Sequence, residues 1–201
     1  MESVTPESIL IHLRKISPLP DEEWQKFLSA CKKYHLRKGE HFFRVGDVGK
    51  NLGIVMRGCL RLYYLNSKGE EFNRAFKFEG DLASTYTFNL EGAPSPMGAE
   101  ALEDTEMLLI DLKDFLKLQE GDFCWERMAA RLALSHYKRK EKREFQFLTM
   151  DASERYLELL KDYPGIENRI PQFHLASYLG ITPFSLSRIV SKIKKGPKTG
   201  P

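Results

Sequence analysis

The stretch LASYLGITPFSLSRIVSKIKK, residues 175–195, decides how the C-terminal part of this chain folds. Apolar side chains recur at helical spacing on both sides of Gly180, and a glycine at this point ends the first segment. Thr182 is a helix-capping residue, and Pro183 suits the first position of the next helix. Two short helices joined by a glycine turn are a helix-turn-helix, which the sequence therefore predicts here.

The second of these helices is basic on the side that its apolar residues leave free. Leu186, Ile189 and Ile193 repeat at helical intervals and are expected to be buried. The free side has no acidic residue; an Arg there binds guanine bidentately, and small polar residues permit close approach to a groove. A solvated basic helix with no nucleic acid partner is the alternative. The expected DNA-binding residues are Thr182, Phe184, Ser185, Ser187, Arg188, Lys192 and Lys194, with Lys195 as a further phosphate contact.

Composition places the rest of the chain among ordinary globular proteins. With 201 residues, 42% hydrophobic and 29% charged, it has room for one large or two small domains. No apolar run approaches the roughly 18 residues that span a bilayer, and the N-terminus lacks the pattern of a secretory signal. We therefore expect a cytoplasmic protein without a membrane partner. Three distant cysteines, Cys31, Cys59 and Cys124, favour reduced thiols over a disulfide framework.

Catalytic and metal-binding patterns are missing from the sequence. It contains no Ser-His-Asp, HExxH, P-loop or Rossmann arrangement and no metal-ligand spacing. We therefore expect a protein that is not an enzyme and that has no catalytic residue, no metal and no cofactor. His174 could reach a DNA phosphate, although a lone helical histidine is more often a surface residue. The five histidines are scattered, at His12, His35, His41, His136 and His174.

Upstream, the pattern changes from helical to β. Thr5-Pro6 and Pro20 precede two short amphipathic helices. From about Leu36 to Ile110, short runs rich in aromatic and branched residues alternate with turn glycines, which predicts a barrel or jelly roll. CLRLYYL and EFNRAFKF flank NSKGE and predict a hairpin in which Gly69 takes a positive φ.

A helix of roughly 25 residues is expected from about Phe123 to Phe147, where neither Pro nor Gly occurs. Its apolar stripe predicts the seam of a two-fold homodimer, and packing on its own barrel is the alternative. Asp151 and Glu154 have the spacing of a capping box, so a further helix begins there. The stripe comprises Trp125, Met128, Ala129, Leu132 and Ser135 or His136.

The sequence thus predicts an α+β protein with four parts. Residues 1–120 would form a double-stranded β-helix, or jelly-roll barrel, with N-terminal helices, and residues 121–150 the long dimerisation helix. Residues 151–195 would form the helix-turn-helix domain, and residues 196–201 a flexible tail.

Several stretches carry a resemblance to a known family. ASYLGITPFSLSRIVSKI resembles the recognition motif of the Crp/Fnr family of bacterial transcription regulators. The strands of that family's cyclic-nucleotide-binding barrel are similar to GEHFFRVGD, NLGIVMRGCLRLYYLNSKGEE, FKFEGD and AEALEDTEMLLI. The resemblance covers about Leu19 to Lys195. It implies a barrel, a dimerisation helix and a winged helix-turn-helix that binds a near-palindromic operator as a homodimer, with RNA polymerase as a further partner of an activator.

Within this resemblance, Arg188 takes the place of a base-contacting Arg, flanked by Ser185 and Ser187. The match is incomplete at two positions. Phe184 lies where many members carry a base-reading Glu, and Pro183 lies where some carry an Arg. Phe184 either touches a thymine methyl or merely packs.

The family's phosphate cassette is degenerate here. Its Gly-Glu pair is replaced by Ser84-Thr85 and its phosphate-binding Arg by Ser95, so both charged partners are missing. From Glu79 to Glu106 there is no Lys or Arg, and this acidic stretch disfavours an anion. We therefore expect no control by cyclic AMP or cyclic GMP. Alternative sources of positive charge are Arg61, Arg74, Lys77, Arg127 and Arg131, and Tyr86, Phe88 and Met97 would suit a neutral, apolar effector.

These observations predict a sequence-specific transcription regulator whose partner is double-stranded DNA. The alternative is a signalling module that binds a cyclic nucleotide or another small ligand and acts through protein partners.

Overall fold

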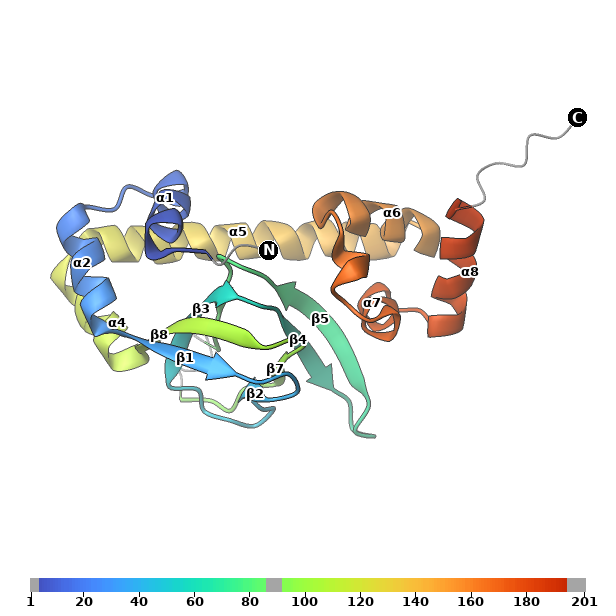
Figure 1. The fold of residues 1–201 in the computed structure, drawn as a ribbon, viewed down its shortest axis with the longest axis horizontal. Helices are drawn as coiled ribbons and strands as arrows, with labels where there is room; N and C mark the ends of the chain where they lie inside the picture. The colour runs from blue at the N-terminus through green and yellow to red at the C-terminus, as the bar shows by residue number, and fades with distance from the viewer. Residues whose placement is uncertain (1–3, 86–91, 195–201) are drawn as a thin grey trace, which may run out of the picture.

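The computed structural model describes residues 4–85 and 92–194. In chain order its elements are α1 (Pro6–Ile16), α2 (Asp21–Ala30), β1 (Cys31–Leu36), β2 (His41–Phe43), β3 (Asn51–Arg57), β4 (Leu60–Leu65), β5 (Glu71–Lys77), β6 (Leu82–Ala83), β7 (Met97–Ala101), β8 (Thr105–Asp111), α4 (Leu112–Gly121), α5 (Phe123–Thr149), α6 (Ala152–Asp162), the 3₁₀ turn η1 (Ile166–Asn168), α7 (Gln172–Leu179) and α8 (Pro183–Lys194). Helix α5 runs along the molecule, with the strands beneath it and helices at both ends (Figure 1).

The strands form two four-stranded antiparallel sheets that enclose one core. Their strand orders are β1-β8-β3-β6 and β2-β7-β4-β5. The chain therefore passes repeatedly from one sheet to the other, as in a jelly roll. Apolar side chains from both sheets, such as Val55, Leu60, Leu62 and Met107, fill the space between them. The predicted hairpin is β4–β5, and Gly69 in its turn has φ 79°. The α+β fold with a jelly roll, long helix and C-terminal helices is confirmed.

The N-terminal helices and the first half of α5 cover the outer face of one sheet. Thr5 caps α1, as predicted, by accepting a hydrogen bond from the Ser8 amide at 3.3 Å. Trp24 and Phe27 of α2 stack with one another, and Phe27 also stacks with Trp125 of α5. The Trp125 indole donates to the Glu23 carboxylate at 2.9 Å. Trp125 and Met128 therefore belong to the chain's own core, which corrects the prediction that they face a second subunit.

The C-terminal helices begin where the capping residues predict. Asp151 and Glu154 form the reciprocal capping box of α6, with the Asp151 side chain accepting from the Glu154 amide at 2.9 Å. Helix α6 ends before Gly165, which has φ 78°. Helices α7 and α8 then form the predicted helix-turn-helix. In residues 92–194 no strand follows β8, so the wing that the resemblance implied is not found there.

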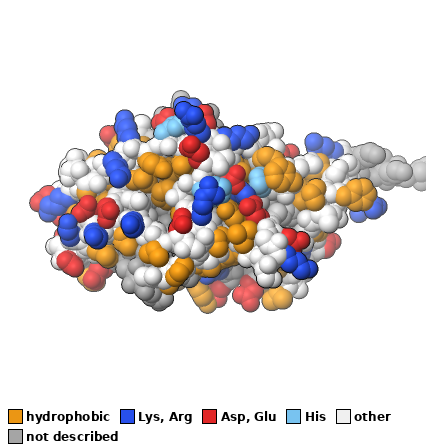
Figure 2. All heavy atoms as spheres, turned by 90° about the horizontal axis from the view of Figure 1, so that it is seen from below, with side chains coloured by type: hydrophobic (Ala, Val, Ile, Leu, Met, Phe, Trp, Pro, Cys, Tyr) orange, Lys and Arg blue, Asp and Glu red, His pale blue; other side chains and the backbone are white. Residues whose placement is uncertain are grey.

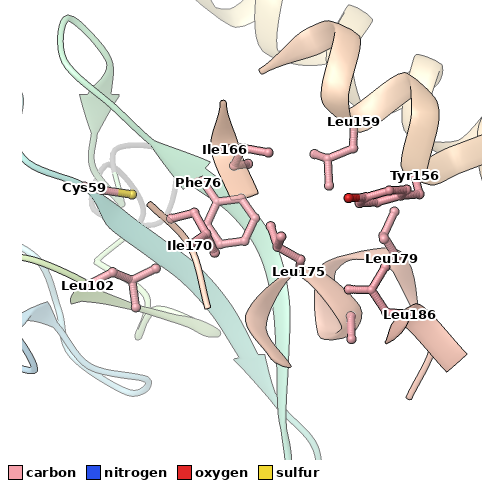
Figure 3. Close-up of a cluster of buried hydrophobic side chains, with 11 residues drawn as sticks. Cys59, Phe76, Leu102, Tyr156, Leu159, Ile166, Ile170, Leu175, Leu179 and Leu186 are labelled. Carbon is pink, nitrogen blue, oxygen red and sulfur yellow. The ribbon is translucent and has the colours of Figure 1, made fainter. Parts of the chain in front are cut away.

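The C-terminal helical region is not connected to the roll through α5 alone, because the two share a hydrophobic core. Figure 3 shows Phe76, Cys59 and Leu102 of the roll meeting Ile166 and Ile170 of the C-terminal region. Farther from the roll, the same cluster is completed by Tyr156, Leu159, Leu175, Ala176, Leu179 and Leu186. The sequence pattern predicted a separate helical domain from residue 151 onwards and did not indicate this shared core.

Candidate nucleic-acid interface

The turn between α7 and α8 is held by both backbone and packing. Gly180 has φ 70°, and a Cβ at this position would lie 2.9 Å from the Phe147 ring of α5. A larger residue would therefore meet strain and steric conflict together. Thr182 caps α8 by accepting from the Ser185 amide at 3.1 Å, and the hydroxyls of the two residues are 3.0 Å apart.

Helix α8 buries one side and presents the other to solvent. Leu186 is fully buried, while Ile189 and Val190 pack against the same core. Most of the predicted DNA-binding side chains are exposed; Ser185 is half-buried because it lies beside the Thr182 cap. The exposed residues are Thr182, Phe184, Ser187, Arg188, Lys192 and Lys194. The cationic face that the sequence predicts is therefore accessible, although Lys195 lies outside the described residues.

Phe184 and Arg188 lie one helical turn apart on this face. The Arg188 guanidinium carbon is 5.9 Å from the centroid of the Phe184 ring, a cation–π distance. Within the described residues, no carboxylate lies within ion-pair distance of Arg188, Lys192 or Lys194. These cations remain available for an anionic partner.

Helix α7, in contrast, contacts the outer edge of the roll. The backbone N–H of Asn73 in β5 donates to the Ser177 hydroxyl at 2.9 Å. The Asn73 side-chain oxygen accepts from Arg61 at 3.1 Å, which leaves its amide nitrogen to face Nδ1 and the carbonyl of His174 at 3.1 and 3.0 Å. Because that nitrogen is a donor, His174 Nδ1 is the acceptor.

This contact decides the role of His174. Its side chain is buried, and burial lowers its pKa to about 4, with the Arg61 charge acting in the same direction. A neutral, buried imidazole bound to Asn73 cannot neutralise a phosphate, so the structure speaks against a phosphate contact of His174 and equally against the exposed surface position that the sequence favoured. His174 is buried because β5 covers the side of α7 that the helical pattern leaves polar, and only the tertiary structure shows this contact.

A cluster of one arginine and two carboxylates makes a second contact between the roll and the helical region. Arg169 follows η1 and pairs with Glu79 at 2.9 Å and with Glu103, and it donates to the Gly58 carbonyl at 3.1 Å. Its guanidinium also lies 5.0 Å from the Phe78 ring. No sequence pattern marks Arg169 or Asn73, because single polar residues carry no periodic signal of an interdomain contact.

The cassette positions are occupied by small buried residues. Ser95 and Thr85 are each 1% exposed, and the Ser95 hydroxyl donates to the Met97 carbonyl at 2.8 Å. Ser84, which directly follows β6, is half-buried. Tyr86 and Phe88 lie outside the described residues.

Three of the five alternative cations already have partners within the chain. Arg61 pairs with Glu71 and Glu100, Arg127 lies over the Phe123 ring, and Arg131 donates to the Ile16 carbonyl. Arg74 and Lys77 of β5 lie near His136 and Arg139 of α5, since the charges of Arg74 and Arg139 help to lower the pKa of both Lys77 and His136. Burial lowers the pKa of Lys77 to about 8 and that of His136 to about 4.

A different side of α5 carries five of the helix's six exposed large apolar residues; the sixth, Phe147, lies beside Gly180. Successive members of the five are eleven, three, eight and three residues apart, so they share one face of the helix. None of them belongs to the Trp125 stripe that the sequence singled out. They are Phe123 at 62%, Leu134 at 53%, Tyr137 at 57%, Phe145 at 58% and Leu148 at 78% exposure.

The roll itself offers no uniform cationic surface on the face shown in Figure 2. Lys and Arg side chains are interspersed there with Asp, Glu and apolar groups. Residues 4–85 and 92–194 also contain no cluster of three or more potential metal ligands, and none of their helices could cross a membrane.

Comparison with known proteins gives consistent results. Residues 33–122 match the family model of the cyclic nucleotide-binding domain. The chain is 28% identical over 178 residues to the cyclic AMP receptor protein of Thermus thermophilus, covering 86% of this chain and 81% of the relative. It is 24% identical over 180 residues to the fumarate and nitrate reduction regulatory protein of Vibrio cholerae, covering 82% and 69%.

The fold is also similar to that of solved structures. FixK2 of Bradyrhizobium japonicum superposes with a TM-score of 0.70 at 23% identity, covering 85% of this chain and 89% of FixK2. The matched domain, the two relatives and the common fold agree with the resemblance of the helix-turn-helix and barrel segments. The chain contains a cyclic nucleotide-binding domain and is similar over most of its length to transcription regulators of the Crp/Fnr family.

Proposed function

We propose that the protein binds a near-palindromic operator in double-stranded DNA as a homodimer and regulates transcription. The observation that carries this proposal is the exposed, unpaired cationic face of α8, supported from behind by a packed helix-turn-helix. A recognition helix enters the major groove, and cations around it bind phosphate. Arg188 would read a base, while Lys192 and Lys194 would contact the backbone.

The exposed apolar stripe of α5 supports the dimer. Five large apolar side chains on one helix face are unusual for a monomer surface, and a second copy of α5 would cover them symmetrically. Two α8 helices related by a two-fold axis then fit half-sites about 34 Å apart. The stripe of Phe123, Leu134, Tyr137, Phe145 and Leu148 replaces the predicted Trp125 stripe as the proposed seam.

Cyclic nucleotides are not the proposed effectors. The carboxylate and the guanidinium that the family cassette requires are both replaced, and Ser95 is hydrogen-bonded to backbone. Calorimetric titration with cyclic AMP and cyclic GMP should therefore give no binding. Binding that disappears in Lys77→Ala or Arg74→Ala would contradict this and would identify β5 as the source of the phosphate-binding charge.

Selection of duplexes from a random library by the full-length protein tests the DNA proposal. We expect a near-palindrome whose half-site centres lie about 10 base pairs apart, bound with strong salt dependence. Recovery of no preferred sequence would contradict sequence-specific binding and would favour the alternative of a signalling module.

Sedimentation tests the dimer. The expected mass is twice the 23.3 kDa of one chain. Leu134→Glu, which puts a charge into the proposed seam, should shift the protein towards monomer, whereas Ser135→Glu, on another face of the helix, should not. Equal effects of the two variants would contradict the assignment of the seam.

A further inference from the structure

Phe184 places a large apolar side chain on the solvent-exposed face of α8. It is the second residue of α8, and its side chain is 71% exposed. The buried residues of the motif lie on the opposite side of the helix, so the ring contributes little to the folded core. The first residues of a recognition helix are those that contact base edges.

The chemistry of the ring limits what it can read. A phenyl group neither donates nor accepts a conventional hydrogen bond, so it gains nothing from the polar edges of guanine, adenine or cytosine. The apolar feature of the major groove is the 5-methyl group of thymine, which phenylalanine contacts favourably.

We propose that Phe184 is a specificity-determining residue that recognises a thymine methyl group in each half-site. The inference rests on the proposed binding of DNA and adds the base pair that α8 selects. Phe184 makes the methyl contact, and Arg188 binds guanine.

The distance between the two side chains sets the spacing of the two bases. The Arg188 guanidinium carbon lies 5.9 Å from the Phe184 ring centroid, while successive base pairs rise by about 3.4 Å. The two groups therefore reach base pairs that are one or two steps apart. Each half-site should hold a thymine within two base pairs of the guanine that Arg188 contacts.

Deoxyuridine provides a clean test, because it lacks only the methyl group of thymine. Each thymine of the library-selected operator is replaced in turn, and binding of the full-length protein is measured by fluorescence anisotropy. Removing one buried methyl from the contact should weaken binding by about fourfold at one thymine per half-site. Phe184→Ala should bind the thymine and deoxyuridine duplexes equally.

Two further variants separate the methyl contact from general effects. Phe173→Ala removes another exposed aromatic ring of the same motif, 56% exposed on α7, and should keep the fourfold dependence. Phe184→Glu should exchange the preferred thymine for a cytosine, because a carboxylate accepts from the cytosine N4 amino group.

The outcomes distinguish the two levels of the proposal. A protein that selects an operator but tolerates deoxyuridine at every position overturns the role of Phe184 and leaves DNA binding intact. Unchanged methyl dependence in Phe184→Ala does the same. A protein that selects no operator overturns the proposed function and this inference with it.

Discussion

The helix-turn-helix presents two contrasting surfaces, one to the roll and one to solvent. On the roll side, Arg169 is satisfied by Glu79, Glu103 and a carbonyl, and His174 is neutral and bound to Asn73. On the solvent side, Arg188 and Lys192 have no ion-pair partner in the described chain. The paired charges fix where the motif sits, and the unpaired charges are left for another molecule.

The contrast follows from solvation. A charge taken out of water must be neutralised by a partner, whereas an exposed charge keeps its hydration until a ligand displaces it. Charge sign alone therefore does not identify a DNA contact, since the C-terminal region uses arginines for both purposes. Variants on the roll side should therefore change stability, and variants on the solvent side should change DNA binding.

The largest effect is expected on the roll side. Arg169→Ala leaves the Glu79 side chain, only 9% exposed, without its counter-charge. The free energy of unfolding should fall by about 3 to 5 kcal/mol, measured by urea denaturation. Arg57→Ala is the control, because Arg57 is 58% exposed and 3.8 Å from Glu106, and its loss should cost less than about 1 kcal/mol. Equal losses would remove the distinction between the two kinds of arginine.

On the solvent side, Arg188→Ala should act on recognition and not on folding. We expect a loss of about 1 to 3 kcal/mol on the selected operator and a smaller loss on a scrambled duplex. The denaturation midpoint should stay the same, because the side chain is exposed. Anisotropy titrations at one salt concentration measure both duplexes. A parallel loss on both would assign Arg188 to phosphate binding instead.

Lowering the pH should reduce the stability of the contact between α7 and the roll, because His174 is neutral there. Its pKa is lowered to about 4 by burial and by Arg61, with Glu100 and Glu71 acting in the opposite direction. The unfolded chain therefore binds the proton first, so this contribution to stability is lost as pH falls from about 6.5 towards 4. From pH 7 to pH 5 the loss should be about 1 to 2 kcal/mol.

His174→Asn keeps an acceptor for the Asn73 amide but cannot titrate, so it should be less sensitive to acid than the unmodified protein. His12→Gln, at an exposed position on α1, is the matched control. Urea denaturation at each pH provides the measurement. The same acid sensitivity in all three proteins would show that His174 is not the titrating group.

The smallest effect is expected from Lys192→Ala. Loss of one phosphate contact should weaken binding to all sequences alike and reduce the slope of log K against log salt by about 1. Titrations over a range of salt concentrations, on operator and scrambled DNA, measure this. A sequence-dependent loss would mean that Lys192 also contacts a base.

Much of the local structure could be predicted because its signals are local. The Asp151–Glu154 capping box, the Gly69 hairpin and the Gly180 turn all depend on residues within a few positions of one another. The exposed side of α8 followed in the same way, since helical spacing separates Leu186 from Arg188. These features hold in the folded protein because nothing in its tertiary contacts overrides them.

Periodicity identified the length of α5, but the first residues of the stripe that it singled out are buried within the chain and are not free for a partner. Trp125 and Met128 are large and regularly spaced, which is equally compatible with a partner subunit and with the chain's own helices. The structure buries them against α2 and leaves Leu134 and Tyr137 exposed. Spacing shows that a stripe exists, but only the packing shows what covers it.

The sequence by itself determined the order of the main elements, several of their caps and turns, the resemblance to the Crp/Fnr regulators, and the basic face of α8, because each of these depends on neighbouring residues. The tertiary structure alone decided that α7 and η1 join the roll, that His174 is neutral and buried, and which side of α5 is open. These outcomes depend on contacts such as Asn73–His174 and Glu79–Arg169, whose members lie far apart in the chain and carry no shared pattern.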